Sequence, residues 1–511
     1  MSALLVLLRL DRSRARAWHG RMIQALMASG ATVRVEAVDD VPLPGSVAIL
    51  FKLEGLVLRR GKADGSDPVD IATLGSPLQA GETPDLAIDL ATSPSSKTWP
   101  TLRALHEGEP GEDAVIGVLL AGVVPVSEIV DAATGQVVER AHASMEGAGG
   151  HAARLGAIGA RLSTVLLAQV RSRIDGRQRP LPPAIASPAH GPARSLARIA
   201  MRMVASQAAS KAYRLSCYAP HWRTGWRLHD GPGVIDTGDL SGPAFRVLPE
   251  RVGHFYADPF PVTWKGQTAI FVEDLDHRSG KGVIVAIPFD ETGPSSASIL
   301  ALEEPWHLSY PFLVEHKGEL YMIPESSAAG TVELYRCTGF PGKWQHCATL
   351  LSGLTLGDAT LIEREGRWWM FGALHDGGGG WSDTLALFSA PDLFGPWRAH
   401  DHSPIFVDRS QARPAGAIVE KGGRLFRPVQ DCSIGYGSRL GLAEITRLDD
   451  GGFAQVLWRL VGPGAQWPGR KLHTLNRHGR LEVIDGSVIR PKSPFLAGLV
   501  ERRTRPRGAA N

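Results

Sequence analysis

The last half of this 511-residue chain repeats a hairpin pattern, and this repeat restricts the possible folds more than any other feature. Each copy is an apolar segment, a polar turn that contains a glycine, and a second apolar segment, which is the pattern of a β-hairpin. A glycine in the turn supplies the positive φ that a tight hairpin needs. These glycines are Gly266, Gly318, Gly366, Gly423 and Gly479, about 50 residues apart.

Further apolar segments between the hairpins, such as residues 282–289 and 384–390, complete units of four strands. Trp344, Trp397 and Trp458 recur in the segment expected for the outer strand of a unit. Five such units predict an all-β five-bladed β-propeller, which we place at residues 215–495. A β-sandwich, the main alternative, does not explain a regular repeat of this length.

The first third of the chain alternates predicted strands with predicted helices. Short apolar runs predict buried strands at residues 4–8, 32–38, 47–53, 86–90 and 114–124. Apolar residues at helical spacing predict a long helix over residues 149–174, and Asp11 is expected to cap an earlier helix that ends near Ser29. We therefore predict a Rossmann-like α/β domain with a parallel sheet for residues 1–175. No GxGxxG motif follows the first strand, so no dinucleotide site is expected.

A proline-rich stretch separates the two regions, with five prolines among residues 177–192. The basic amphipathic segment that follows has two interpretations. It is either a helix that lies on an anionic membrane surface or a partner, or a connecting helix packed on the next domain. We assign residues 176–214 to this linker and helix, and residues 496–511 to a basic tail.

Composition excludes several classes of function. The chain has 55 Lys+Arg and 52 Asp+Glu, and no basic stripe interleaved with aromatic residues, so nucleic acid is not an expected partner. Its four cysteines and 17 histidines show no metal-binding spacing, so no metal or other cofactor is expected. No apolar run reaches the roughly 18–20 residues that span a bilayer. The N-terminus lacks the charge order of a signal peptide, so we expect a cytoplasmic location. The oligomeric state is left open.

Propeller geometry predicts that polar residues gather at one mouth of the channel. The first strand of each blade lines the channel, and its beginning lies at the same rim as the end of the second strand. Offsets from the turn glycines bring to this rim Asp258, Glu273, His307, Tyr310, Glu325, Asp358, Arg413, Gln430 and His473. Polar groups at such positions need partners or ligands. They form either a hydrogen-bonded ring that closes the channel or a sugar pocket with two catalytic carboxyl groups.

Four phrases in the sequence, HFYADPF, HLSYPFLVEHKGELYMIPES, GDATLIEREGRWWMFG and RPAG, give residues 250–490 a family resemblance. This region resembles the five-bladed propeller of family 43 glycoside hydrolases. It is more similar still to the family-43-like domain at the N-terminus of plant glucosamine inositolphosphorylceramide transferases and in related bacterial proteins. The α/β region has a vague similarity to formyltransferase-type N-terminal domains. It lacks their Asn/His/Asp constellation, so that activity is not expected.

The resemblance implies roles for three positions. Family 43 enzymes use an Asp base on blade one, a pKa-tuning Asp on blade two and a Glu acid on blade three. Asp258 matches the base, whereas Tyr310 replaces the tuning Asp, with Glu325 nearby, and Asp358 replaces the acid. The side chain of Asp358 is one methylene shorter than that of the usual Glu, and no Asp stands at the position that raises the pKa of the acid. Both departures call the ordinary inverting route into question.

We therefore expect a carbohydrate-active protein that acts on a glycosidic bond of a sugar or glycolipid, by hydrolysis or by transfer. Asp258 is the expected base or nucleophile, Asp358 the expected acid, and Glu325 and Glu273 the expected tuning or sugar-binding carboxylates. The expected sugar ligands are His307, Tyr310, Arg413, Gln430 and His473. The alternative is a glycan- or glycolipid-binding module without chemistry.

Overall fold

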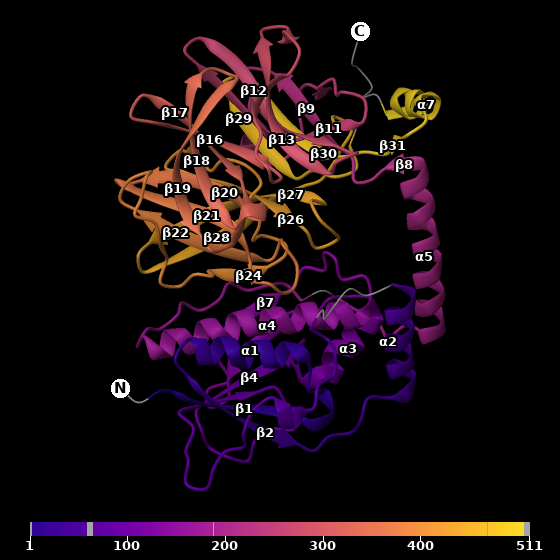
Figure 1. Cartoon of the computed structure of the whole chain (residues 1–511), viewed down its shortest axis with the longest axis vertical. Helices are drawn as coiled ribbons and strands as arrows, with labels where there is room; N and C mark the ends of the chain where they lie inside the picture. Colours follow the sequence, from indigo (N-terminus) through magenta and orange to yellow (C-terminus); the bar gives the residue numbers. More distant parts are fainter. Residues whose placement is uncertain (1–2, 59–64, 188, 468, 505–511) are drawn as a thin grey trace. The chain divides into compact units, whose positions relative to one another are not determined.

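A computed structural model describes residues 3–58, 65–187, 189–467 and 469–504 of the chain (Figure 1). The chain divides into two compact units. Unit 1 contains Met1–Ala209 together with Asp376–Gly380 and Phe406–Asp408, and unit 2 contains Ser210–His375, Trp381–Ile405 and Arg409–Asn511. Among the helices described, none is both long enough and apolar enough to cross a membrane.

The sheet of unit 1 is mixed, with the strand order β2-β1-β3-β4-β6-β7-β24 and a short strand β5 beside β4. Its strands are β1 (Leu5–Asp11), β2 (Thr32–Val38), β3 (Leu86–Asp89), β4 (Thr101–His106), β5 (Glu109–Pro110), β6 (Ser127–Asp131), β7 (Val137–His142) and β24 (Phe406–Asp408). β1 to β4 pair in parallel, and the apolar run of β1 is buried as predicted. β6 pairs antiparallel with β4 on one side and with β7 on the other, and a tight turn after Asp131 joins β6 to β7. The prediction of a wholly parallel sheet is therefore wrong at β6 and β7.

Two segments that were predicted to be strands are helices. Residues 47–53 lie in α2 (Gly45–Val57), and most of residues 114–124 lie in α3 (Gly111–Ala121). Val47 and Leu50 pack against Ile116 and Leu120, so each helix buries side chains three or four residues apart. A short apolar run is compatible with either a buried strand or a buried helix, and this ambiguity explains the two errors.

The predicted long helix is α4 (His151–Ile174), which packs against α1 (Ala17–Ala28). Gly159 permits this close packing, because a Cβ atom there would lie only 2.6 Å from the ring of Trp18. Asp11 does not cap α1, since its carboxylate accepts hydrogen bonds from the backbone and hydroxyl of Thr92 instead. A short 3-10 turn, Arg12–Arg14, separates Asp11 from the helix.

After the proline-rich linker comes α5 (Leu196–Ser216), and its sequence continues across the division between the two units. Ile199 is its one buried residue, and most of its other side chains are exposed. Ile199 packs against α2 and α3 of unit 1, and both interpretations of this segment stay predictions.

Unit 2 is a β-propeller built from antiparallel sheets. One sheet contains β11 (His254–Trp264), β12 (Gln267–Asp276), β13 (Lys281–Asp290), β14 (Gly293–Pro294) and β15 (Ile299–Leu302). The next contains β16 (Ser309–His316), β17 (Glu319–Glu325), β18 (Thr331–Gly339) and β19 (Lys343–Ser352). An antiparallel run follows with β20 (Thr355–Arg364), β21 (Arg367–His375), β22 (Thr384–Ala390) and β23 (Arg398–Ala399). A further sheet contains β25 (Val419–Lys421), β26 (Arg424–Asp431), β27 (Arg439–Asp449) and β28 (Gly452–Val461).

The predicted hairpins are confirmed at the turns. Gly266, Gly318, Gly366, Gly423 and Gly479 all have positive φ, between 56° and 78°. In the first three turns the residue before the glycine also has positive φ, as a two-residue hairpin turn of the type I′ geometry requires. The turns therefore fix the register of each pair of strands.

The remaining sheet joins the two ends of unit 2. Its strands are β9 (Trp222–Leu228), β10 (Arg246–Val247), β29 (Thr474–His478) and β30 (Leu481–Ser487), in the order β10-β9-β30-β29. β8 (Cys217–Tyr218) and β31 (Arg490–Pro491) pair with each other in a separate two-stranded sheet, α6 (Val234–Thr237) follows β9, and α7 (Pro494–Thr504) follows β31. The first and last strands of the propeller thus pair with each other and close the ring.

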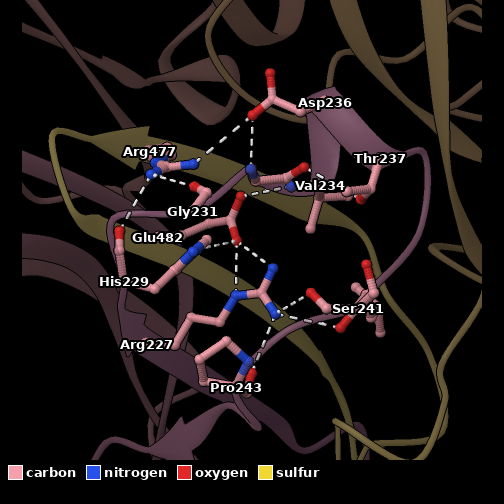
Figure 2. Close-up of polar contacts among 12 residues, drawn as sticks. Arg227, His229, Gly231, Val234, Asp236, Thr237, Ser241, Pro243, Arg477 and Glu482 are labelled. Atoms are coloured by element: carbon pink, nitrogen blue, oxygen red, sulfur yellow. Dashed lines mark hydrogen bonds and ion pairs between the residues drawn. The ribbon is translucent and has the colours of Figure 1, made fainter.

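A buried ion pair lies within this closing sheet (Figure 2). Arg227 of β9 faces Glu482 of β30, and its Nε donates to Glu482 Oε2 at 2.7 Å. Arg227 Nη1 donates to the backbone carbonyls of Leu240, Ser241 and Pro243 (Figure 2). The pair therefore connects both strands with the loop that follows β9.

Candidate active site

Asp258, Tyr310 and Asp358 occupy equivalent positions in β11, β16 and β20. Each lies at a shift in the pairing register with the second strand, and their φ angles are 51°, 42° and 54°. Residues other than glycine rarely adopt such backbone angles, which cost free energy and concentrate at functional sites. A bulge of this kind also changes the direction of a side chain. The repeat therefore places an unusually oriented side chain at the start of three channel strands.

The strand register brings the predicted residues to one end of the sheets. Ala257 pairs with Glu273, Ser309 with Glu325, and Thr474 with Asp485. In the fourth repeat, the backbone N–H of Gln430 donates to the carbonyl of Arg413 at 2.9 Å. The prediction that starts of first strands and ends of second strands share one rim is confirmed by these pairings.

Asp258 is buried and is held by residues of β29 and β30. Its Oδ1 accepts a hydrogen bond from Thr474 Oγ1 at 2.9 Å and lies 3.5 Å from His473 Nε2. Its backbone N–H donates to Asp485 Oδ2 at 2.8 Å. Burial raises the pKa of Asp258 to about 6, and the charge of Asp485 adds to this effect while His473 opposes it. This carboxyl group therefore changes its protonation state close to neutral pH.

His473 bridges two carboxylates. Its Nδ1 lies 2.5 Å from Asp485 Oδ1, while its Nε2 faces Asp258. Burial alone would lower the pKa of His473, but the charges of Asp485 and Asp258 outweigh burial and raise it. Asp258, His473 and Asp485 could also offer three ligand atoms to a metal ion. Because both ring nitrogens already face carboxylates, we interpret the group as an ion-paired imidazolium.

Asp358 is surrounded by donors. Arg413 Nε donates to its Oδ2 at 2.5 Å, Gln430 Nε2 donates to the same oxygen at 3.1 Å, and Arg413 Nη2 donates to its Oδ1 at 3.3 Å. Burial raises the pKa of Asp358 well above its ordinary value, and Arg413 opposes this shift. All three contacts treat Asp358 as an acceptor, so its two oxygens are already engaged.

Glu325 shares Arg413 with Asp358. Its Oε2 lies 3.7 Å from Arg413 Nη2 and accepts the backbone N–H of Asp358 at 3.2 Å, and Ser327 donates to its Oε1. Burial opposes ionisation of Glu325, but Arg413 and these hydrogen bonds outweigh it and lower its pKa. Glu325 is therefore ionised at neutral pH.

Glu273 has the opposite environment. Burial raises its pKa well above the ordinary value, and the nearby charges of Asp258, Glu325 and Asp485 add to the shift. His307 Nε2 lies 3.3 Å from Glu273 Oε1. The backbone N–H of Gly282 donates to His307 Nδ1, and burial lowers the pKa of this histidine, so the neutral ring carries its proton on Nε2. Burial and the neighbouring carboxylates therefore favour the protonated form of Glu273.

Tyr310 differs from the expectation of a sugar ligand. Its side chain is fully buried, and its hydroxyl interacts with Thr360 Oγ1 and accepts the backbone N–H of Gly416, both at 2.8 Å. Its ring packs edge-on against Phe260. The hydroxyl already has two partners, so Tyr310 belongs to the packed interior of the propeller.

Two residues of the site were not among the sequence-based candidates: Trp222 and Tyr436. The ring of Trp222 stacks on His473 with 4.1 Å between ring centroids, and Tyr436 lies edge-on to both rings. The guanidinium of Arg413 lies 5.0 Å from the Tyr436 ring centroid. Tyr436 follows β26 in a glycine-rich loop at the predicted rim, and this position could have marked Tyr436 as a candidate residue of the site. Trp222 instead comes from β9, more than 200 residues before His473 in the sequence.

The raised pKa of Asp258 predicts a pH-dependent stability. A carboxyl group with a pKa of about 6 in the folded chain and 3.8 as its ordinary value binds its proton more tightly when folded. Its contribution to stability is therefore greatest below pH about 3 and decreases by about 3 kcal/mol as the pH rises to about 7. We expect the unfolding free energy of the wild type, relative to Asp258→Asn, to fall by this amount between those pH values in urea titrations. A difference that grows with pH would contradict the assignment.

Residues 249–485 match the family described as glucosamine inositolphosphorylceramide transferase 1, N-terminal. The protein named glucosamine inositolphosphorylceramide transferase 1 from Arabidopsis thaliana is 32% identical over 240 residues, which are 46% of this chain and 31% of that protein. The protein of the same name from Oryza sativa subsp. japonica is 32% identical over 250 residues, which are 46% of this chain and 34% of that protein. The chain thus spans about a third of the length of these relatives.

Solved structures with a similar chain path include glycoside hydrolases. A family 117 glycoside hydrolase from Zobellia galactanivorans has 12% identity and a TM-score of 0.35, with 52% of this chain and 90% of that chain covered. A GH43 protein from Bacillus licheniformis has 20% identity and a TM-score of 0.32, with 42% of this chain and 45% of that chain covered. The sequence match is the more specific finding: residues 249–485 match the N-terminal domain family of the glucosamine inositolphosphorylceramide transferases, as the motifs of this region predicted.

Proposed function

We propose that this protein is carbohydrate-active and acts on a glycosidic bond of a sugar or glycolipid at the rim of its propeller. The observation that carries the proposal is a cluster of buried carboxyl groups beside aromatic rings. Asp258, Glu273, Glu325, Asp358 and Asp485 gather there with the cationic side chains of Arg413 and His473. Carboxyl groups with separated pKa values are the usual acid and base of glycoside chemistry.

Asp258 is the proposed general base. Its pKa of about 6 makes it ionised at neutral pH yet basic enough to accept a proton from water or from a sugar hydroxyl. Thr474 and His473 contact only its Oδ1. Its Oδ2 is then the oxygen that takes the proton.

Glu273 is the proposed general acid, in place of Asp358, which is the candidate that the sequence suggests. An acid must hold a proton at the working pH and must be able to release it to the leaving oxygen. Burial raises the pKa of both Glu273 and Asp358, but the oxygens of Asp358 are already engaged as acceptors by Arg413 and Gln430. We propose that Asp358 and Glu325 instead hold Arg413 in place for sugar hydroxyls.

The aromatic rings support the choice of a sugar as ligand. Trp222 and Tyr436 lie beside His473, and Tyr436 also contacts Arg413. Aromatic rings next to hydrogen-bonding groups suit a ligand that has both apolar C–H faces and hydroxyl groups. The curated relatives carry the name of a transferase that involves glucosamine and inositolphosphorylceramide, and we extend this substrate class, a sugar on a lipid, to the present chain.

The architecture supports the proposed site. We propose that unit 2 has five blades, in which the run β20–β23 counts as one blade and the closing sheet β10-β9-β30-β29 as another. We also propose that the parallel strands β2-β1-β3-β4 of unit 1 with their helices are a Rossmann-like core. The active site needs residues of all five blades, so a partial propeller is expected to be inactive.

A substrate screen tests the proposed function. The purified full chain is incubated with aryl furanosides and aryl pyranosides, with and without sugar acceptors, and the same protein is applied to a glycan array. Turnover on at least one glycoside is expected, and the choice between water and a sugar acceptor separates hydrolysis from transfer. If no glycoside is turned over while glycans bind, and Asp258→Asn binds them equally well, the protein is a glycan-binding module instead.

Glu273→Gln tests the identity of the acid. Gln has nearly the same shape as the protonated acid and can accept the contact from His307, but it has no proton to transfer. We expect turnover to fall at least about 100-fold on glycosides with poor leaving groups. The loss should nearly disappear with a dinitrophenyl leaving group, which departs without a proton. Asp358→Asn is the matched comparison: if it shows this dependence on the leaving group and Glu273→Gln does not, the acid is Asp358.

A further inference from the structure

Helix α5 (Leu196–Ser216) has two apolar faces, and unit 1 covers only one of them. Ile199 and Leu196 pack against Val47, Leu50 and Ile116 of α2 and α3, which explains the first face. No packing of that kind explains the second, which is exposed among the residues described. A helix that only connects two parts of a chain has no need for a second apolar face.

The second face is continuous along the helix. Its residues are Ala197, Met201, Val204, Ala208, Ala212 and Leu215, separated by four or three residues at each step. This spacing places them on one side of an α-helix. Met201, Val204 and Leu215 are 67%, 52% and 72% exposed. We call these six residues the outer stripe.

The charges of α5 are of one sign. Arg198, Arg202, Lys211 and Arg214 are its charged residues, and residues 196–216 contain no Asp or Glu. By helical geometry, Arg198 and Lys211 border the outer stripe on opposite sides, and Arg202 and Arg214 lie farther round the helix on those two sides. These basic side chains are exposed. An apolar stripe bordered by basic residues is complementary to the interface of an anionic lipid bilayer, which offers both acyl chains and negative head groups.

We propose that α5 lies on a membrane surface that contains anionic lipid, with the outer stripe inserted at the level of the head groups and Arg198, Arg202 and Lys211 contacting phosphates. This binding surface is separate from the carboxyl cluster of unit 2 and does not depend on the reaction proposed for it. The contact is peripheral, because only one face of the helix enters the interface.

Vesicle sedimentation with the full chain tests the proposal. The vesicles are phosphatidylcholine alone or phosphatidylcholine with about 30% phosphatidylserine. We expect binding to the anionic vesicles that weakens as salt is added, because salt screens the basic residues. Arg198→Gln/Arg202→Gln/Lys211→Gln should bind about 100-fold more weakly, since each basic residue near such a surface contributes about fivefold. Met201→Gln/Val204→Gln/Leu215→Gln should also lose about 100-fold, because the inserted apolar area is removed.

The matched control removes the same number of charges elsewhere. Arg278→Gln/Lys343→Gln/Arg398→Gln changes three exposed basic residues of unit 2 and should bind like the wild type. Circular dichroism and melting temperature establish that all variants are folded. The proposal is overturned if the wild type does not bind anionic vesicles, if it binds neutral vesicles equally well, or if the control loses as much as the α5 variants. A wild-type dimer that the outer-stripe variant converts to monomer, without vesicle binding, would assign the stripe to a second copy of the chain.

Discussion

Replacing Asp258 with Asn is expected to lower the turnover of a glycoside by about 10²–10⁴-fold. Asn tolerates the positive φ of 51° at this position, and its amide oxygen can still accept the hydrogen bond from Thr474. The substitution therefore removes basicity while the backbone and the neighbouring contacts remain. The measurement is kcat/KM on the best glycoside of the screen, with the melting temperature recorded in parallel.

The pH profile gives this prediction a second readout. If Asp258 is the base, kcat/KM of the wild type should fall below pH about 6, tenfold for each unit, because the protonated carboxyl group cannot accept a proton. In Asp258→Asn the residual kcat/KM should not show this decrease at acidic pH. If the variant shows the same decrease as the wild type, another group is the base.

Asp274→Asn is the matched control for Asp258→Asn. Asp274 is also a buried carboxylate of the same sheet, but it pairs with His254 and Arg251 rather than with the rim cluster. Its replacement should reduce stability and leave the activity per folded molecule nearly unchanged. If both variants lose activity only in proportion to their loss of folded protein, Asp258 has a structural role.

Much of the site could be predicted because hairpin repeats carry information about register. A glycine with positive φ fixes the turn, and counting outward from Gly266 or Gly318 leads to residues that pair at the rim, such as Glu273 and Glu325. The alternation of a strand then determines which residues share a face. This reasoning needs no knowledge of long-range contacts, since the repeat supplies the same geometry in each copy.

The direction of a side chain could not be predicted in the same way. Asp258 and Tyr310 occupy equivalent bulges, yet Asp258 contacts Thr474 and His473 at the rim while the Tyr310 hydroxyl contacts Thr360 and Gly416 in the interior. The long apolar ring of a tyrosine gains more from burial than a carboxylate does. Trp222 was missed for a different reason, because its place beside His473 depends on pairing between β9 and β30 at opposite ends of unit 2.

Segments outside the repeat were predicted less well because only their composition was available. The runs at residues 47–53 and 114–124 are apolar and short, and such runs occur in buried strands and buried helices alike. The ends of α3 were nevertheless present in the sequence: acidic Glu112 and Asp113 in its first turn and Gly122, with φ of 91°, at its end. Reading these end signals before the apolar run would have favoured the helix.

The closing sheet of the propeller gives the largest expected loss of stability. Arg227→Met should lower the unfolding free energy of unit 2 by about 3–5 kcal/mol at neutral pH, because it leaves Glu482 buried without its cation. The carbonyls of Leu240 and Ser241 also lose their donor. Urea unfolding followed by tryptophan fluorescence measures this loss, since most of the tryptophans lie in unit 2.

Arg480→Met is the matched control, because Arg480 directly precedes β30 but makes exposed ion pairs with Asp230 and Glu291. Exposed pairs contribute little, so this variant should lose less than about 1 kcal/mol. The double variant Arg227→Met/Glu482→Leu, which leaves no buried charge, should be more stable than Arg227→Met alone. If Arg227→Met and Arg480→Met lose equal stability, the buried pair does not hold the propeller closed.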